Sequence, residues 1–60
     1  MTKQQVRDAI RAAGMTGTYR DGEWRVNFPN GREATAYYTT DDQDAIDTAK
    51  AMAQEQEKGA

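Results

Sequence analysis

The sequence contains no cysteine, no histidine, no leucine and no serine. Without cysteine there is no disulfide framework and no thiolate metal site, so nothing marks the chain for an oxidising compartment. Without histidine, cysteine or serine, the familiar nucleophile–base pairs of enzymes are unavailable. A chain of 60 residues also has little room for the deep cleft that tunes a catalytic pKa. We therefore expect no enzyme and no cofactor.

Long apolar runs are absent as well. No stretch approaches the roughly 20 apolar residues of a membrane span, and residues 1–15 carry charges but no apolar run, which argues against a signal peptide. We expect a cytoplasmic protein without membrane contact. The bulky aliphatic side chains are only Val6, Ile10, Val26 and Ile46. Residues 1–60 should therefore form one small, marginally stable domain, which a partner or a weak homodimer would stabilise.

The aromatic residues, by contrast, are concentrated between residues 18 and 39, at positions 19, 24, 28, 37 and 38. Within this window, Asp21-Gly22 suits a two-residue type I′ hairpin. Pro29-Asn30-Gly31 predicts a second turn of type I, in which Gly31 takes the left-handed conformation and closes a three-residue loop. A five-residue loop keeps the same alternation and stays open as an alternative. The window predicts a three-stranded antiparallel meander.

The turns assign the strand residues to two faces. The first turn pairs Tyr19 with Trp24, and a three-residue second loop pairs Val26 with Ala34. A four-residue loop would turn every inner residue outward, so the pattern argues against it. The inner face should hold Tyr19, Trp24, Val26, Phe28, Ala34, Ala36 and Tyr38. The outer face should hold Thr18, Arg20, Glu23, Arg25, Asn27, Glu33, Thr35, Tyr37 and Thr39.

A helix is predicted on each side of the meander. Thr2 and Gln5 have capping-box spacing before a helix over residues 3–13, and Gly14 with Met15 predicts a Schellman motif. Thr40 is the predicted N-cap of a second helix over residues 41–56. The segment 55–60 should fray. The fold class is α+β, with αβββα order and both helices on one sheet face. Trp24→Ala should be the most damaging single change, at about 3–5 kcal/mol.

The acidic cluster at positions 41, 42, 44 and 47 is the one candidate metal site. Its spacing lacks the glycine and the later glutamate of a calcium loop. Carboxylates at a helix N-terminus are favoured by the helix dipole without any ligand. We therefore expect no metal at this cluster.

The outer face of the sheet is the candidate binding surface, on which Arg25 and Tyr37 should be exposed to solvent. The alternative is an ordinary solvated sheet face, because threonine, arginine and tyrosine are also good strand formers. The candidate partner-binding residues are Arg20, Arg25, Asn27, Arg32, Thr35 and Tyr37. A secondary basic face is formed by Lys3, Arg7 and Arg11, which suits phosphates or simply solvent. Residues 1–32 carry a net charge of +3 and residues 33–60 one of −5, an asymmetry that suits a charged partner.

The segment Gly17-Thr18-Tyr19-Arg20-Asp21-Gly22-Glu23-Trp24-Arg25-Val26-Asn27-Phe28, followed by Gly31 and the segment 38–45, resembles AP2-like DNA-binding domains. These include the amino-terminal arm-binding domains of phage-type integrases. The resemblance implies a sheet whose outer face reads the major groove, with Arg20, Arg25, Asn27 and Arg32 as the contacts. This chain differs by its additional amino-terminal helix and its acidic net charge of −2.

The αβββα order also resembles the double-stranded-RNA-binding domain. In that family a lysine cluster at the start of the second helix holds phosphates, whereas this chain has Asp41, Asp42 and Asp44 there. These carboxylates would repel a phosphate backbone, so we do not expect double-stranded RNA to bind. The segment 33–42 is similar to short proteins carried by bacterial phages and plasmids.

Together these patterns predict a non-enzymatic binding or regulatory protein. The first hypothesis is a phage- or plasmid-type modulator that binds a host protein through the open sheet face. The alternative is a DNA-binding domain that reads the duplex with the same face.

Overall fold

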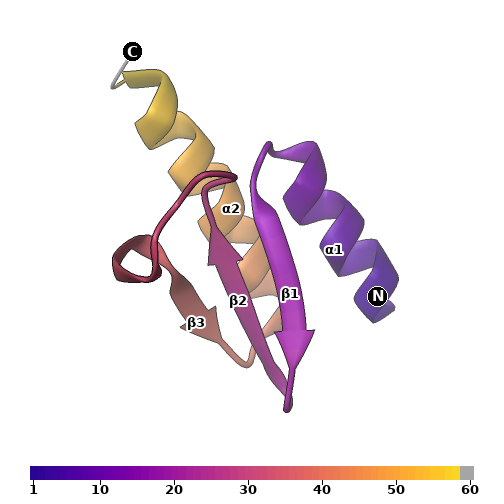
Figure 1. Ribbon diagram of the computed structural model, residues 1–60. Helices are drawn as coiled ribbons and strands as arrows, with labels where there is room; N and C mark the ends of the chain where they lie inside the picture. The colour runs from indigo at the N-terminus through magenta and orange to yellow at the C-terminus, as the bar shows by residue number, and fades with distance from the viewer. Residues whose placement is uncertain (59–60) are drawn as a thin grey trace.

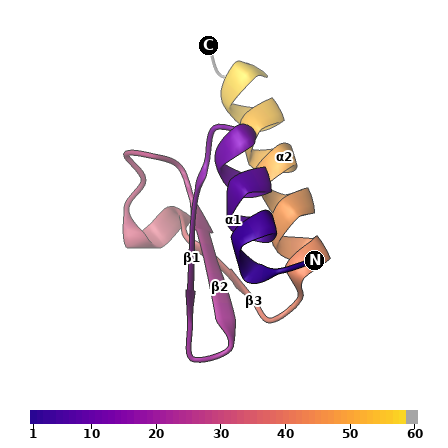
Figure 2. The ribbon, with the colours of Figure 1, turned by 90° about the vertical axis from the view of Figure 1, so that its right-hand side faces the viewer.

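The computed structural model describes residues 1–58, and Gly59 and Ala60 are not described. Helix α1 (Lys3–Ala12) is followed by strands β1 (Thr16–Arg20) and β2 (Glu23–Asn27). A short 3-10 helix, η1 (Glu33–Thr35), precedes strand β3 (Tyr37–Thr39) and helix α2 (Asp42–Lys58). The strands form one antiparallel sheet in the order β1-β2-β3, and both helices cover the same face of it (Figures 1 and 2). The predicted αβββα architecture is confirmed.

Helix α1 has the predicted ends. Thr2 Oγ1 accepts a hydrogen bond from Gln5 N at 3.1 Å, and Gln5 Oε1 accepts one from Thr2 N at 2.8 Å. At the other end Gly14 has φ +87°, and Met15 N donates to the Ile10 carbonyl oxygen at 3.2 Å. These bonds form the capping box and the Schellman motif that the sequence predicts.

Helix α2 begins one residue later than predicted. Asp41, not Thr40, is the N-cap: its Oδ1 accepts hydrogen bonds from Gln43 N at 2.8 Å and Asp44 N at 3.1 Å. The Thr40–Gln43 capping box was therefore the wrong prediction, because an aspartate at position 41 competes for the same amides. The helix extends to Lys58. The predicted fraying of the tail stays a prediction, and its last two residues lie outside the described part.

The core lies between the helices and the sheet. Trp24, Val6, Ile10 and Val26 are fully buried, and the small side chains of α2 at positions 45 and 49 allow that helix to approach closely. Gly17 makes a similar approach possible on β1, since a Cβ atom there would lie 2.8 Å from Ile10 Cδ1. Tyr19, Phe28 and Met52 pack against the edge of this core. The predicted inner positions are thus confirmed on β1 and β2.

The first hairpin matches the prediction. Arg20 pairs with Glu23 and Tyr19 with Trp24. The two turn residues, Asp21 and Gly22, have φ values of +54° and +79°, as a type I′ turn requires.

The second connection does not match it. Val26 pairs with Tyr37 and Trp24 with Thr39, so the loop of three or five residues is wrong and β3 is displaced by an odd number of positions. Side chains alternate along a strand, so this displacement exchanges the two faces. Tyr37 and Thr39 lie on the helix side, and Tyr38, opposite Arg25, lies on the outer side.

The side chain of Asn27 explains why strand pairing stops. Asn27 is buried, and its Oδ1 accepts hydrogen bonds from Phe28 N at 2.8 Å and from the Thr35 hydroxyl at 2.7 Å. Its Nδ2 donates to the Arg32 carbonyl oxygen at 3.0 Å. These bonds replace a strand ladder by a compact loop over residues 28–36, which leans over the outer face of the sheet (Figure 2).

That loop begins with the predicted turn around Pro29. Gly31 N donates to the Phe28 carbonyl oxygen at 2.9 Å, and neither Asn30 nor Gly31 has a positive φ, which fits type I. The predicted left-handed conformation of Gly31 was therefore wrong. Glycine is needed there for space, since a Cβ atom would lie 2.2 Å from Asn27 Oδ1.

Candidate functional site

The outer face of the sheet, opposite the two helices, is the candidate site. It carries an open hollow of about 380 Å³ whose wall comes from both hairpin strands, η1 and β3. The lining residues are Thr18, Arg20, Asp21, Glu23, Arg25, Glu33 and Tyr38. The type I′ hairpin positions the first five of these side chains, and the loop over residues 28–36 brings Glu33 above the sheet.

Three of these residues form a fixed cluster. Glu33 Oε2 accepts hydrogen bonds from Arg25 Nε at 3.3 Å and from a terminal guanidinium nitrogen of Arg25 at 3.0 Å. Glu33 Oε1 accepts a hydrogen bond from the Tyr38 hydroxyl. The hydrogen bonds from Tyr38 and Arg25 lower the pKa of Glu33 below its usual range. The side chains of Tyr38 and Glu33 raise the pKa of Arg25.

The hollow carries both signs of charge. Arg25 is neutralised by Glu33, whereas the described residues contain no ion-pair partner for Arg20, Asp21 or Glu23. Two arginines face three carboxylates, so this surface is slightly acidic. It offers donors, acceptors and one aromatic ring to a ligand, but no excess of positive charge.

Of the six predicted partner-binding residues, only Arg20 and Arg25 line the hollow. Asn27 lies on the outer side of β2, but it is buried and its polar atoms are hydrogen-bonded within the 28–36 loop, so it is not exposed on this face as predicted. The Thr35 hydroxyl is held by Asn27 and by the Arg32 carbonyl oxygen. Arg32 is exposed in the loop, where it lines a second, more apolar hollow with Phe28, Pro29, Ala34 and Gln56.

Tyr37 lies on the opposite face from the one predicted. Its hydroxyl donates to Asp44 Oδ2 on α2 at 2.7 Å, and this bond raises the pKa of Tyr37. Sequence reasoning missed Tyr38, which takes the place beside Arg25. The two tyrosines are adjacent, so their faces depend on the register of β3 alone.

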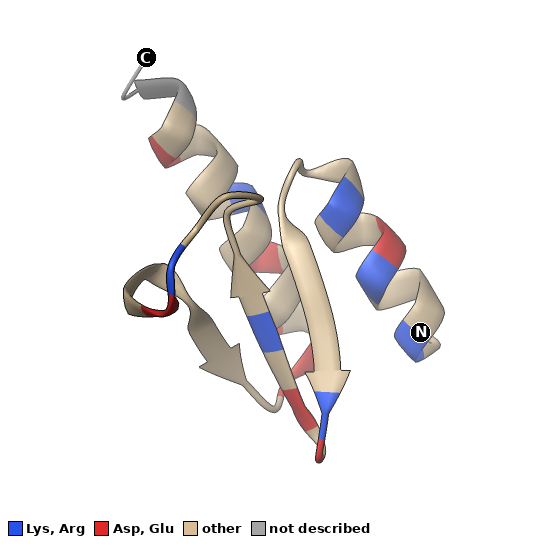
Figure 3. Cartoon of the chain, in the orientation of Figure 1, with Lys and Arg blue, Asp and Glu red and all other residues tan. Residues whose placement is uncertain are grey.

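The three side chains of the predicted secondary basic face have different surroundings. Lys3 Nζ lies 2.8 Å from Asp42 Oδ1 and 4.6 Å from the centre of the Tyr19 ring. Arg7 donates to Gln4 Oε1 at 3.4 Å on its own helix, and Arg11 is exposed. Figure 3 shows these basic positions along α1, with mostly acidic positions on α2.

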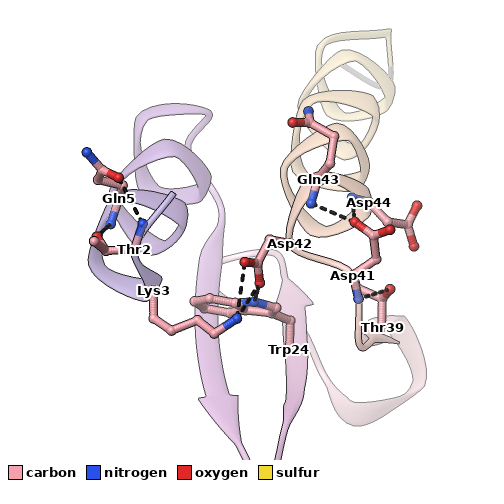
Figure 4. A network of polar contacts seen from close by, with 9 residues as sticks. All are labelled: Thr2, Lys3, Gln5, Trp24, Thr39, Asp41, Asp42, Gln43 and Asp44. Carbon is pink, nitrogen blue, oxygen red and sulfur yellow. Dashed lines mark hydrogen bonds and ion pairs between the residues drawn. The ribbon is translucent and has the colours of Figure 1, made fainter.

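Lys3 belongs to a polar network that ties both helices to the sheet (Figure 4). Asp42 Oδ1 accepts a hydrogen bond from Trp24 Nε1 at 2.7 Å as well as from Lys3. The contacts with Lys3 and Trp24 lower the pKa of Asp42, and the contact with Asp42 raises that of Lys3. Lys3 and Asp42 are therefore structural residues.

The other carboxylates of the acidic cluster also have partners within the chain. Asp41 caps α2, Asp44 holds Tyr37, and Asp47 Oδ1 accepts a hydrogen bond from Gln43 Nε2 at 3.0 Å. Among residues 1–58 there is no group of three or more acidic side chains placed to hold a metal ion. No helix in the described part of the chain is long and apolar enough to cross a membrane.

Comparisons of this chain with protein-family models, with curated proteins and with solved structures gave no match. The candidate site therefore has to be interpreted from its own geometry.

Proposed function

We propose that this chain is a non-enzymatic binding or regulatory protein that engages a protein partner through the outer face of its sheet. The observation that supports this most directly is the hollow on that face, where Tyr38 and a mixed set of charges lie beside the type I′ hairpin. Tyrosine and arginine are the residues that most often carry binding energy at protein interfaces. Neither α1 nor α2 covers this face, which carries only the 28–36 loop with η1 (Figure 2).

The mixed charge favours a protein over a nucleic acid. A DNA-binding surface gains most of its affinity from lysines and arginines that neutralise phosphates. Here Asp21, Glu23 and Glu33 stand beside the two arginines of the hollow, and Arg25 is already paired. Arg20 and Arg25 nevertheless keep DNA binding as the second candidate, since both are also contacts in the resemblance to integrase arm-binding domains.

We further propose that the chain acts in the cytoplasm as a phage- or plasmid-type modulator of a host protein. The similarity of residues 33–42 to short phage and plasmid proteins supports this origin. The absence of cysteine from the sequence is compatible with a reducing compartment.

A capture experiment tests this proposal. The tagged chain is incubated with a bacterial lysate with and without nuclease, and the captured proteins are compared. We expect a captured protein that is unaffected by nuclease, because its contacts are with this chain and not through nucleic acid. Capture that disappears with nuclease would contradict the protein-partner proposal.

A salt titration with duplex DNA tests the second candidate. A protein that contacts several phosphates loses affinity steeply as the salt concentration rises. We expect no measurable binding to a mixed-sequence duplex even at low salt. Binding at low salt that falls steeply with added salt would favour the DNA alternative.

A further inference from the structure

Strand β3 forms one edge of the sheet, and its backbone is open on one side. Arg20 and Glu23 flank a two-residue turn and exchange backbone hydrogen bonds. The backbone N–H and C=O groups of successive residues point to opposite sides of a strand, so those of Trp24 and Val26 point toward β3. Their partners Thr39 and Tyr37 therefore use their backbone groups within the sheet. The N–H and C=O of Tyr38 point outward. No loop or cap of the described residues supplies them with a backbone partner.

This edge also carries the two most exposed aromatic side chains of the described residues. Tyr37 is 41% exposed and Tyr38 is 43% exposed, and they lie on opposite faces of the strand. A strand added beside β3 would contact Tyr37 on the helix side and Tyr38 on the outer side. At the opposite edge of the sheet α1 lies alongside β1, so an added strand would meet this helix there (Figure 1).

The charges beside β3 are acidic on both faces. Asp44 is bound to the Tyr37 hydroxyl on the helix side, and Glu33 is bound to the Tyr38 hydroxyl on the outer side. The Glu33 side chain is 70% exposed even though it is paired with Arg25. Like charges next to a paired strand are unfavourable and opposite charges are favourable. A second copy of this chain would bring two such acidic sets together, which disfavours pairing of β3 with itself.

We propose that the free edge of β3 binds an extended, lysine- or arginine-containing segment of a partner protein as a fourth strand. Backbone hydrogen bonds to Tyr38 provide the pairing, as in other cases of strand addition to an open sheet edge. Basic side chains of the partner lie near Glu33 and over the tyrosine rings, where cations are attracted by the ring electrons. The edge shares Glu33 and Tyr38 with the hollow, but it binds through the backbone of β3. A test that alters this backbone and leaves the side chains in place therefore separates the inference from the proposed function of the outer face.

The test uses a short labelled peptide of alternating lysine and valine, which places its cations on one face and its apolar groups on the other. The full chain is made by chemical synthesis in three forms: unmodified, N-methylated at Tyr38, and N-methylated at Tyr19. The Tyr38 methyl group replaces the outward N–H but leaves the phenol ring in place. The Tyr19 variant is the matched control, because alternation turns its N–H away from β2 at the opposite edge of the sheet, where α1 lies alongside β1. Near-ultraviolet circular dichroism of Trp24 confirms that each form is folded.

We expect the peptide to bind the unmodified chain and the Tyr19 variant alike, and to bind the Tyr38 variant about tenfold or more weakly. A peptide of alternating glutamate and valine should not bind. Equal binding to all three forms, loss of binding in both methylated forms, no binding to the unmodified chain, or equal binding of the glutamate peptide would each overturn the proposal. Self-association of the unmodified chain that is lost on methylation at Tyr38 would assign the edge to a second copy and would also overturn it.

Discussion

Asn27 shows how one side chain decides the shape of the outer face. Its outward position in the sheet was predictable from alternation, but its burial was not, because the 28–36 loop that covers it is held by the same side chain. Two backbone groups and one hydroxyl depend on this amide. A residue that looks available for binding in the sequence is thus a structural residue in the fold.

We expect Asn27→Ala to lower the free energy of unfolding by about 1–3 kcal/mol, because it removes three hydrogen bonds that hold the partly buried base of the loop. Urea unfolding followed by the fluorescence of Trp24 measures the change. Asn30→Ala, in the exposed part of the same loop, is the control and should have little effect. An Asn27→Ala variant as stable as the control would contradict this role.

Gly31 depends on the same amide. Gly31→Ala would place a Cβ atom 2.2 Å from Asn27 Oδ1, and we expect the overpacking to lower the free energy of unfolding by about 1–3 kcal/mol. In an Asn27→Ala background the clash with Asn27 is removed and only the one with Thr35 Oγ1, at 2.8 Å, remains, so the additional cost of Gly31→Ala should be smaller. Urea unfolding of the four chains gives this coupling. Additive effects would show that the two residues do not meet.

Among the elements, helices α1 and α2 and the first hairpin were predictable because their determinants are local. Helix caps and the Asp21-Gly22 turn act within a few residues of the structure they specify. The position of β3 was not predictable, because it depends on how residues 28–36 fold against Asn27. A change of register by an odd number of residues moves every side chain of a strand to the other face. The 28–36 connection therefore places Tyr38 at the candidate site, where the sequence predicted Tyr37.

The contact between α1 and α2 is expected to be sensitive to acid. The pKa of Asp42 is lower in the folded chain than in the unfolded one because of Lys3 and Trp24. Its contribution to stability is therefore complete above the ordinary carboxyl pKa of about 4 and is lost as the pH falls through the lowered value. Glu33, whose pKa is lowered in the same direction, adds to this loss.

We expect the stability of the unmodified chain to fall as the pH is reduced below about 4, and Asp42→Asn to make that fall smaller. Thermal unfolding between neutral and acidic pH measures both profiles. Asp47→Asn, an exposed position on the same helix, is the control and should keep the profile of the unmodified chain. Identical slopes for all three chains would mean that the Lys3–Asp42–Trp24 network does not hold the helices.

At the scale of the whole molecule, the chain is a two-layer domain in which one layer, the sheet, keeps an open side. The sequence was sufficient to predict this open side, since the apolar side chains that alternate along β1 and β2 give both helices a single face to cover. It was not sufficient to predict the composition of the hollow, which combines Arg20 and Glu23 of the local hairpin with Glu33 and Tyr38 from the distant connection. The slight excess of carboxylates there is what favours a protein partner.

The most direct test of binding through the outer face compares substitutions of the two adjacent tyrosines. Tyr37 and Tyr38 are nearly equally exposed but lie on opposite faces of the sheet. Tyr38→Ala and Tyr37→Ala are compared with the unmodified chain in quantitative capture of the nuclease-insensitive partner. We predict that Tyr38→Ala abolishes capture and that Tyr37→Ala retains it, since only Tyr38 lines the hollow. Undiminished capture by Tyr38→Ala would contradict binding through the outer face of the sheet.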